Sequence, residues 1–367
     1  MIVLLFFNFV ALLLTYLAQK GIIKNGLGWG MALVTVIAAI RYDYGLDYWE
    51  YFADYERVIK YYSINDILSG KVGYRGEDGW YLLMYIMKPL GISGFFVLVA
   101  LISIFQGVVV YSLIKAYVPK KWMVFALFVY LFSLSLYVGS LSGMRQHFAM
   151  SIIGCTIPLI IKKKIIPSIV IILVTSIIHT SSLIFLPFIF WGYVPLGKSR
   201  YLSFIYISLY IVFLVSASLS STLVGDFLKI DKFEHYDTYL NEENQFNYFG
   251  FGYVTSLLLP YLVSILYLYK NYNDETKKRL VSIAAAGMTL LPVMASVHLG
   301  TRLLYYFDFI EIVTIPIAFS SIKSKPLRTP LMAAYSLFLL YAYYDYFHSE
   351  LRYSSTYFYH SLLDFII

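Results

Sequence analysis

The residues with the greatest chemical potential form four polar clusters in an otherwise apolar sequence. The first cluster runs from Arg41 to Tyr51, with Asp47 near its centre, and continues at Glu77 and Trp80. Carboxylates serve as general bases, and aromatic rings stack on sugar rings, so this stretch is compatible with a glycan-binding site. Two simpler interpretations stay open: Asp47 as the cap of a helix, and the tyrosines as an interfacial aromatic belt.

The second cluster is a group of hydrogen-bond donors. Arg145, Gln146 and His147 follow one another two residues after Gly143. An arginine that faces hydrocarbon costs roughly 2.5–3.5 kcal/mol at the bilayer centre, so Arg145 is expected either to snorkel to the interface or to bind an anion. The adjacent donors favour the anion, and phosphate oxygens suit them well.

The remaining clusters are built around His179 and Arg302. His179 lies within an apolar stretch, where a histidine donates to phosphate, transfers a proton or is simply a hydrogen-bonded structural residue. Arg302 and Tyr305 share one face of a predicted helix, and Asp308 lies deeper in the same span. Ionisable groups at that depth usually face the bundle interior. Asp308 is therefore a candidate for function or for a buried ion pair with Arg302 or Arg145.

The elements that must position these clusters are membrane-spanning helices. Of the 367 residues, 60% are hydrophobic and 13% are charged, whereas a soluble domain is about a quarter charged. Apolar runs of roughly 15–22 residues recur along the chain, as spanning helices require. Twelve spans are predicted, near residues 2–18, 26–40, 94–114, 122–138, 147–161, 165–178, 182–196, 201–223, 250–269, 280–297, 303–321 and 329–346.

Two of these assignments have alternatives. The pair 165–178 and 182–196 could equally form one long broken helix, and the stretch 80–90 is predicted to be interfacial or re-entrant.

The N-terminal run is followed rather than preceded by Lys20 and Lys24, which is the wrong polarity for a cleaved signal peptide. It is therefore predicted to be a retained span.

Basic residues orient the chain. Most of the 28 lysines and arginines fall in loops near residues 20, 118, 163, 199, 275 and 325. The positive-inside rule assigns these loops to the cytoplasm, where their lysines contact anionic lipid headgroups. The long loops 41–93 and 224–249 then face outward, and all four clusters fall on that side. Their convergence predicts a pocket for an anionic, polar ligand such as a lipid-linked phosphate.

The expected organisation is a single transmembrane domain over residues 1–367. The net charge of +7 follows from the loop lysines, so nucleic-acid binding is not expected. The single cysteine, Cys155, falls in a predicted span and is expected to pack there. The carboxylates lack a recognisable metal-ligand spacing, so neither a metal nor a cofactor is expected.

The order and spacing of the clusters resemble the EpsG family of Wzy-type polysaccharide polymerases, which join oligosaccharide repeat units carried on undecaprenyl diphosphate. Leu46 departs from the family's pattern, which has a small or hydroxylated residue before the aspartate. The resemblance implies an all-α, polytopic membrane helical bundle of the GT-C-like type in the bacterial plasma (inner) membrane. It rests on Arg41 to Tyr51, Glu77 to Trp80, Gly143 to Gln146, His179 to Ser182, and Arg302 with Tyr305 and Tyr306.

The reaction that the resemblance implies is glycosyl transfer without a nucleotide sugar, on the periplasmic or exterior face, to make O-antigen, capsule or exopolysaccharide. An acceptor hydroxyl attacks the anomeric carbon of a growing chain and expels undecaprenyl diphosphate. Arg145 and Arg302, with Arg41 as a third candidate, would meet the charge developing on the diphosphate.

The other implied roles are acid–base chemistry and substrate contact. His179 would add a donor, and the carboxylates that would orient or deprotonate the acceptor rank as Asp47, then Glu77, then Asp308. The further substrate-binding candidates are Gln146, Tyr48 and Tyr305.

Three other membrane activities share these sequence features. A flippase or exporter of the same lipid-linked sugar would need intramembrane charge that reaches the cytoplasmic side, whereas the deep charge here is predicted in the outer half. A ligase that moves the finished glycan to another acceptor is chemically nearly identical. A membrane O-acyltransferase would show polar residues on its cytoplasmic face. The expected partners are lipid-linked oligosaccharides, membrane lipid and, as a candidate, a chain-length regulator protein.

Overall fold

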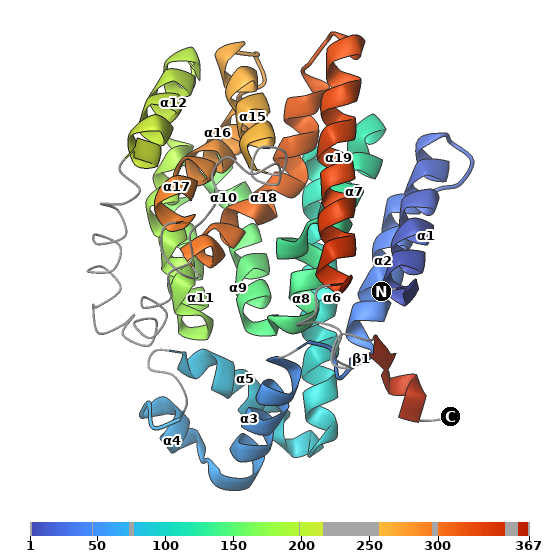
Figure 1. Ribbon diagram of the computed structural model, residues 1–367. Coiled ribbons are helices and arrows are strands. Elements are labelled where there is room, and N and C mark those ends of the chain that lie inside the picture. Colours follow the sequence, from blue (N-terminus) through green and yellow to red (C-terminus); the bar gives the residue numbers. More distant parts are fainter. Residues whose placement is uncertain are drawn as a thin grey trace. The chain divides into compact units, whose positions relative to one another are not determined.

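The computed structural model describes residues 2–45, 47–72, 77–197, 199–215, 257–295, 300–348 and 359–365, and it is almost entirely helical (Figure 1). Five of its helices are long and apolar enough to cross a membrane, and a sixth span is formed if a helix pair bent by 52° is counted as one. Five more apolar helices are 10–17 residues long. The chain is therefore an all-α polytopic membrane protein, as predicted, while the number of twelve spans and the GT-C-like architecture stay predictions.

The helices follow the predicted apolar runs closely. The candidate spans are α1 (Ile2–Gln19), α6 (Ser93–Tyr117), α9 (Met144–Gly154) with α10 (Ile157–Ile161), α16 (Glu275–Thr289) with α17 (Leu291–Ala295), and α18 (Gly300–Ser320). The bent pair consists of η2 (Lys120–Trp122) and α7 (Met123–Phe132), then the π-helical turn η3 (Leu134–Val138) and α8 (Gly139–Ser142). The others are α2 (Gly26–Ala39), α11 (Ile165–Ile178), α12 (Ser199–Val215), α15 (Leu259–Tyr269) and α19 (Lys325–His348).

The predicted pair 165–178 and 182–196 is interrupted at His179. The second member of the pair is the 3-10 helix η4 (Thr180–Gly192), which contains Pro187. A proline has no backbone N–H to donate within a helix, which agrees with the departure from α-helical geometry in this segment. The predicted loop 224–249, the end of the predicted span 201–223 and the start of 250–269 lie outside the described residues.

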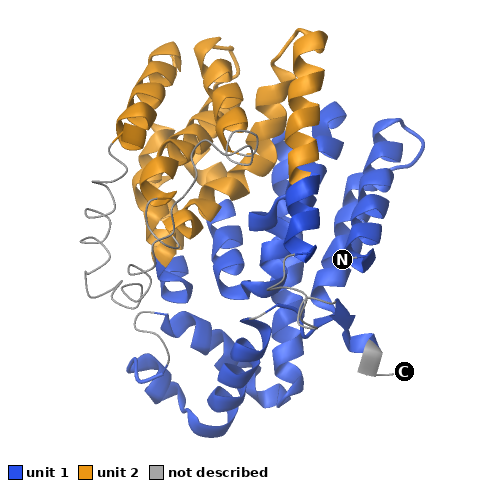
Figure 2. Cartoon of the chain, viewed as in Figure 1, with its two compact units in different colours: residues 1–154, 174–180, 340–367 blue, residues 155–173, 181–339 orange. Residues whose placement is uncertain are grey.

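The chain groups into two compact units (Figure 2). Unit 1 contains residues 1–154, 174–180 and 340–367, and unit 2 contains residues 155–173 and 181–339. Helices α11 and α19 contribute residues to both units. The expectation of a single transmembrane domain stays a prediction.

In unit 1, the long segment between α2 and α6 is folded into helices around an aromatic core. Its elements are β1 (Arg41–Tyr42), α3 (Asp47–Tyr61), α4 (Ile64–Leu68), α5 (Asp78–Met87) and η1 (Lys88–Leu90). Helix α3 has acidic residues in its first turn and Lys60 in its last, which complements the helix dipole. Buried Tyr48, Tyr55, Trp80 and Phe95 form one apolar cluster. The stretch 80–90, which was predicted to be interfacial or re-entrant, forms most of α5 and all of η1 and contributes to this apolar cluster.

The end of α2 is held by segments that are distant in sequence. The last carbonyl groups of a helix have no partner within it, and here Tyr359 donates to the carbonyl oxygen of Ile37 at 2.6 Å. Strand β1 pairs with β2 (His360–Ser361), with Arg41 opposite Ser361. The segment around residue 360 therefore lies at the same end of α2 as the start of the 41–93 segment.

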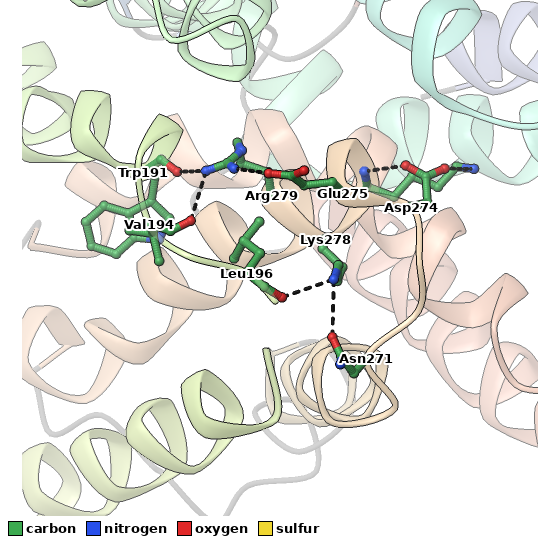
Figure 3. Close-up of polar contacts among 9 residues, drawn as sticks. Trp191, Val194, Leu196, Asn271, Asp274, Glu275, Lys278 and Arg279 are labelled. Atoms are coloured by element: carbon green, nitrogen blue, oxygen red, sulfur yellow. Dashed lines mark hydrogen bonds and ion pairs between the residues drawn. The ribbon is translucent and has the colours of Figure 1, made fainter. Parts of the chain in front are cut away.

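In unit 2, Lys278 and Arg279 near the start of α16 are buried and donate hydrogen bonds to backbone carbonyl groups (Figure 3). Arg279 donates to the carbonyl oxygen of Trp191 and pairs with Glu275 at 2.7 Å. Lys278 donates to the carbonyl oxygen of Leu196 at 3.0 Å. The expectation that loop lysines contact lipid headgroups is therefore wrong for Lys278, because its buried ammonium group donates to the Leu196 carbonyl oxygen and to Oδ1 of Asn271.

We predict that the contact between α1 and α2 does not tolerate a side chain at Gly26. A Cβ atom there would overlap the carbonyl oxygen of Leu14, and one at Gly30 would lie 2.7 Å from that of Ala11, the close approach typical of small-xxx-small helix pairs. Gly26→Ala should therefore lower the free energy of unfolding by about 1–3 kcal/mol, measured by denaturant titration in detergent. Gly28→Ala is the matched control, since a Cβ there would meet only the Asn25 side chain. Equal stability of the two variants would contradict this account.

Candidate active site

A buried carboxylate, Glu77, joins three segments of unit 1. Its Oε1 atom lies 2.8 Å from Nδ1 of His179 and accepts a hydrogen bond from the backbone amide of Thr180 at 3.1 Å. Its Oε2 atom forms an ion pair with Nη1 of Arg145 at 2.7 Å. The side chain of Glu77 is 1% exposed, and that of Arg145 is 16% exposed. Both oxygens of the carboxylate are therefore engaged, while part of the arginine stays accessible.

These contacts fix the charge of Glu77. Burial by itself raises the pKa of this carboxyl group, but the hydrogen bond from His179, the charges of His179 and Arg145, and the Thr180 amide outweigh it and lower the pKa to about 2. Glu77 is therefore ionised at physiological pH. Because a carboxylate only accepts hydrogen bonds, Nδ1 of His179 is the donor in this contact.

The close approach of α5 to the end of α11 depends on Gly79. A Cβ atom at this position would lie 3.0 Å from Cγ2 of Ile177 and 3.1 Å from the Ile177 backbone. His179 and Thr180 follow Ile177 almost directly. The missing side chain at Gly79 therefore lets Glu77, which immediately precedes α5, reach both of them.

The buried polar atoms without a hydrogen-bond partner in the part of the chain that the structure describes include Nε1 of Trp80 and Oγ1 of Thr180. Both residues are almost fully buried. Buried polar groups nearly always have partners, so these are atoms that we expect a bound molecule to use. An indole N–H and a hydroxyl both donate, as does Arg145, and donors of these types suit phosphate oxygens.

Tyr51 is a site residue that the sequence analysis left out of its candidates. Burial raises the pKa of Tyr51; the charge of Arg145 and a hydrogen bond with its backbone act against this shift, and Asp47 and Glu77 add to it. Tyr51 therefore interacts electrostatically with Arg145, Glu77 and Asp47. Asp47 and Tyr51 are four residues apart on α3, a spacing that places them on one face, and this was the signal in the sequence.

Arg41 and Tyr48 lie in a different environment. The guanidinium group of Arg41 is buried and donates to the carbonyl oxygens of Ala38 and Leu141 and to the hydroxyl of Ser103. Tyr48 is buried in the aromatic core, with its hydroxyl 3.4 Å from the Arg41 carbonyl oxygen. Both residues thus have structural partners, and the substrate contacts predicted for them stay predictions.

Gln146 and His147, which follow Arg145, lie in different environments. Gln146 is half-buried next to Arg145. His147 is buried, with Nδ1 2.8 Å from the Gly143 carbonyl oxygen and Nε2 3.0 Å from that of Ser135. Its two ring nitrogens are thus directed at backbone carbonyl groups, so His147 supports the turn before α9 rather than adding a donor for phosphate.

The last predicted cluster lies in unit 2, on α18. Arg302 is exposed, while Tyr305 and Asp308 are half-buried. The neighbouring Tyr306 is buried, and its hydroxyl lies 3.0 Å from Oγ of Ser181. The roles predicted for Arg302, Tyr305 and Asp308 stay predictions.

Fold and site together define a class of protein: a polytopic helical membrane protein in which one buried carboxylate holds an arginine and a histidine beside donors that have no partner in the described chain. The model of the EpsG family matches residues 31–361. The chain therefore belongs to the EpsG family, which is a family of Wzy-like polymerases, and the resemblance seen in the sequence is confirmed. No curated protein and no solved structure matches the chain.

We predict that Glu77 makes the stability of the protein depend on pH in the acid range. Its pKa is lowered from 4.5 to about 2, so its stabilising effect is present above pH 4.5 and is lost as the pH falls through 2. Each pKa unit corresponds to about 1.4 kcal/mol, so the loss is about 3 kcal/mol. Glu77→Gln should remove it, measured as the free energy of unfolding of each protein at pH 6 and pH 2.

The control for this measurement is Glu56→Gln, which changes a partly exposed carboxylate of α3 that pairs with Lys60. This variant should keep the wild-type pH dependence. Parallel stability curves for wild type and Glu77→Gln would show that the carboxylate is not held in its charged form.

Proposed function

We propose that this protein is a glycosyltransferase that polymerises oligosaccharide repeat units carried on undecaprenyl diphosphate. The observation that carries the proposal is the buried Glu77 group with Arg145 and His179, in a chain that belongs to a Wzy-like polymerase family. The positive-inside pattern supports placing the reaction on the extracytoplasmic face of the bacterial plasma membrane. The product would be an O-antigen, a capsule or an exopolysaccharide.

The proposed role of Arg145 is to stabilise the leaving diphosphate. As the bond between the anomeric carbon and the phosphate oxygen breaks, negative charge grows on that oxygen, and a fixed guanidinium donor in a dry site meets it effectively. The hydroxyl of Thr180 and the indole N–H of Trp80 supply further donors. Glu77 holds Arg145 in place, so we assign Glu77 to positioning.

The proposed base is Asp47. A carboxylate with a pKa of about 2 accepts a proton poorly at neutral pH, because efficient bases titrate near the working pH. This argues against Glu77 in that role and favours Asp47, which neighbours Tyr51. The acceptor hydroxyl would pass its proton to Asp47 as its oxygen bonds to the anomeric carbon. His179 would donate or accept through Nε2.

The other candidates rest on the resemblance to the family. Arg302 is proposed as a second arginine for the diphosphate, and Asp308 as an alternative base. The remaining residues proposed to contact substrate are Gln146, Tyr305, Arg41 and Tyr48.

We predict that Arg145→Ala and Arg302→Ala each abolish the product ladder made by purified protein from a lipid-diphosphate-linked oligosaccharide in liposomes. Loss of one such donor typically slows catalysis by roughly 100- to 1,000-fold. Asp47→Asn should slow it by roughly 100- to 10,000-fold, the usual contribution of a general base. The ladder is read on a gel, and the melting temperature of each variant reports its folding.

The control variant is Arg57→Ala, since Arg57 is an exposed arginine of α3 that pairs with Asp54. It should form the wild-type ladder. Failure of the wild type to extend any lipid-linked repeat, together with movement of that substrate across the bilayer, would replace the enzyme with a flippase. Single transfer to a different acceptor without a ladder would indicate a ligase.

A further inference from the structure

The loop that precedes α3 holds one carboxylate in a strained backbone conformation. Asp43 has a φ of 46°, in the left-handed region that residues other than glycine rarely adopt. Gly45 follows with a φ of 81°, and a Cβ atom there would overlap the side chain of Ser142. Strain of this kind persists only where the surrounding structure enforces it, and it is frequent at functional sites.

The surroundings of Asp43 are rigid on both sides. Tyr42, the residue before it, pairs with His360 in the β1–β2 ladder. Tyr44, the residue after it, is fully buried. Contact with Ser142 ties the loop to the turn that leads into α9, three residues before Arg145. The backbone around Asp43 is therefore held on both sides within unit 1.

One oxygen of the Asp43 carboxylate lacks a hydrogen-bond donor among the described residues. Its Oδ1 atom is buried and accepts no hydrogen bond from the residues that the structure describes. Leaving a buried acceptor unsatisfied is costly, and more so when it carries charge. The carboxylate is therefore poised to accept hydrogen bonds from a molecule rich in hydroxyl groups.

An aromatic surface packs against Tyr42, the residue that precedes Asp43. The ring centroid of Trp49 lies 5.5 Å from that of Tyr42, 5.9 Å from that of Tyr48 and 5.3 Å from that of Phe52, all edge to face. These contacts restrain the indole, yet 39% of Trp49 stays exposed. Tyr42 contacts the restrained, accessible Trp49 indole and directly precedes Asp43, so it connects the indole to the segment that carries the unsatisfied carboxylate.

We propose that Asp43 and Trp49 form a sugar-binding subsite. The hydroxyl groups of a pyranose ring donate to the Asp43 carboxylate, and the apolar face of the same ring packs on the Trp49 indole. The combination of an aromatic surface and a few fixed polar atoms is typical of small-molecule sites. The ligand is a sugar of the oligosaccharide substrate, so the proposal rests on the proposed function and adds a residue pair that selects the glycan.

The test is binding of lipid-free oligosaccharide, because a diphosphate site and a sugar site then give separate results. The probes are oligosaccharides of one and two repeat units, prepared by partial hydrolysis of the polysaccharide that the native organism makes. Binding to the full chain in nanodiscs is measured by saturation-transfer NMR and titrated for Kd. Asp43→Asn should weaken binding roughly 10- to 100-fold, as expected for loss of hydrogen bonds to a charged acceptor, and Trp49→Ala should do the same.

Matched variants separate a sugar contact from a structural role. Trp49→Phe keeps a ring and should retain part of the affinity, while Glu56→Gln and Tyr61→Ala change an exposed pair partner and an exposed ring of the same helix and should bind as wild type does. No binding by wild type, or equal binding by wild type, Asp43→Asn and Trp49→Ala, would overturn the subsite and would indicate that Trp49 belongs to an aromatic belt. Either result leaves the ladder assay to decide on polymerisation independently.

Discussion

The site depends on the need to balance one buried negative charge. Moving a carboxylate out of water is unfavourable unless it is paired and hydrogen-bonded, and Glu77 meets this requirement with Arg145, His179 and the Thr180 amide. Removing Arg145 would leave the buried carboxylate without its ion-pair partner. The ion pair therefore fixes how α5, α9 and the end of α11 meet within unit 1.

The same constraint links local structure to the proposed chemistry. Gly79 permits the close approach that Glu77 needs, and the aromatic core around Trp80 and Tyr48 holds α3 and α5 in place. Because both carboxylate oxygens of Glu77 contact other groups, the proposed role of Glu77 is to orient Arg145 and His179. Transition-state stabilisation by fixed charged groups requires this kind of preorganisation.

Much of the site could be predicted because polar residues are rare in this sequence. Glu77, Arg145 and His179 were identified as charged or titratable residues beside apolar runs, and the resemblance to the EpsG family connected them. The helices were predicted for the same reason, since apolar runs of spanning length indicate where they form. Segments with a proline or a break, such as η4, were less well defined.

The partners of individual side chains could not be predicted, because many come from distant segments, such as His179 for Glu77, and others are backbone carbonyl groups at helix ends and turns. The sequence did not indicate that backbone carbonyl groups accept from Arg41 and face His147, and the substrate contact of Arg41 stays a prediction. Lys278 appeared to be a surface lysine, but it is buried. Tyr51 was overlooked among 37 tyrosines, since composition does not separate an interfacial ring from one beside an arginine.

The most direct test of the central claim is a double-mutant cycle on stability with Glu77→Gln, Arg145→Gln and the double variant. Breaking a buried ion pair by removing one partner costs about 3–5 kcal/mol, so each single variant should be strongly destabilised. The double variant should lose much less than the sum, with a coupling free energy of roughly 2 kcal/mol or more. Effects that add to within about 0.5 kcal/mol would mean that the two residues act independently, which would contradict the account.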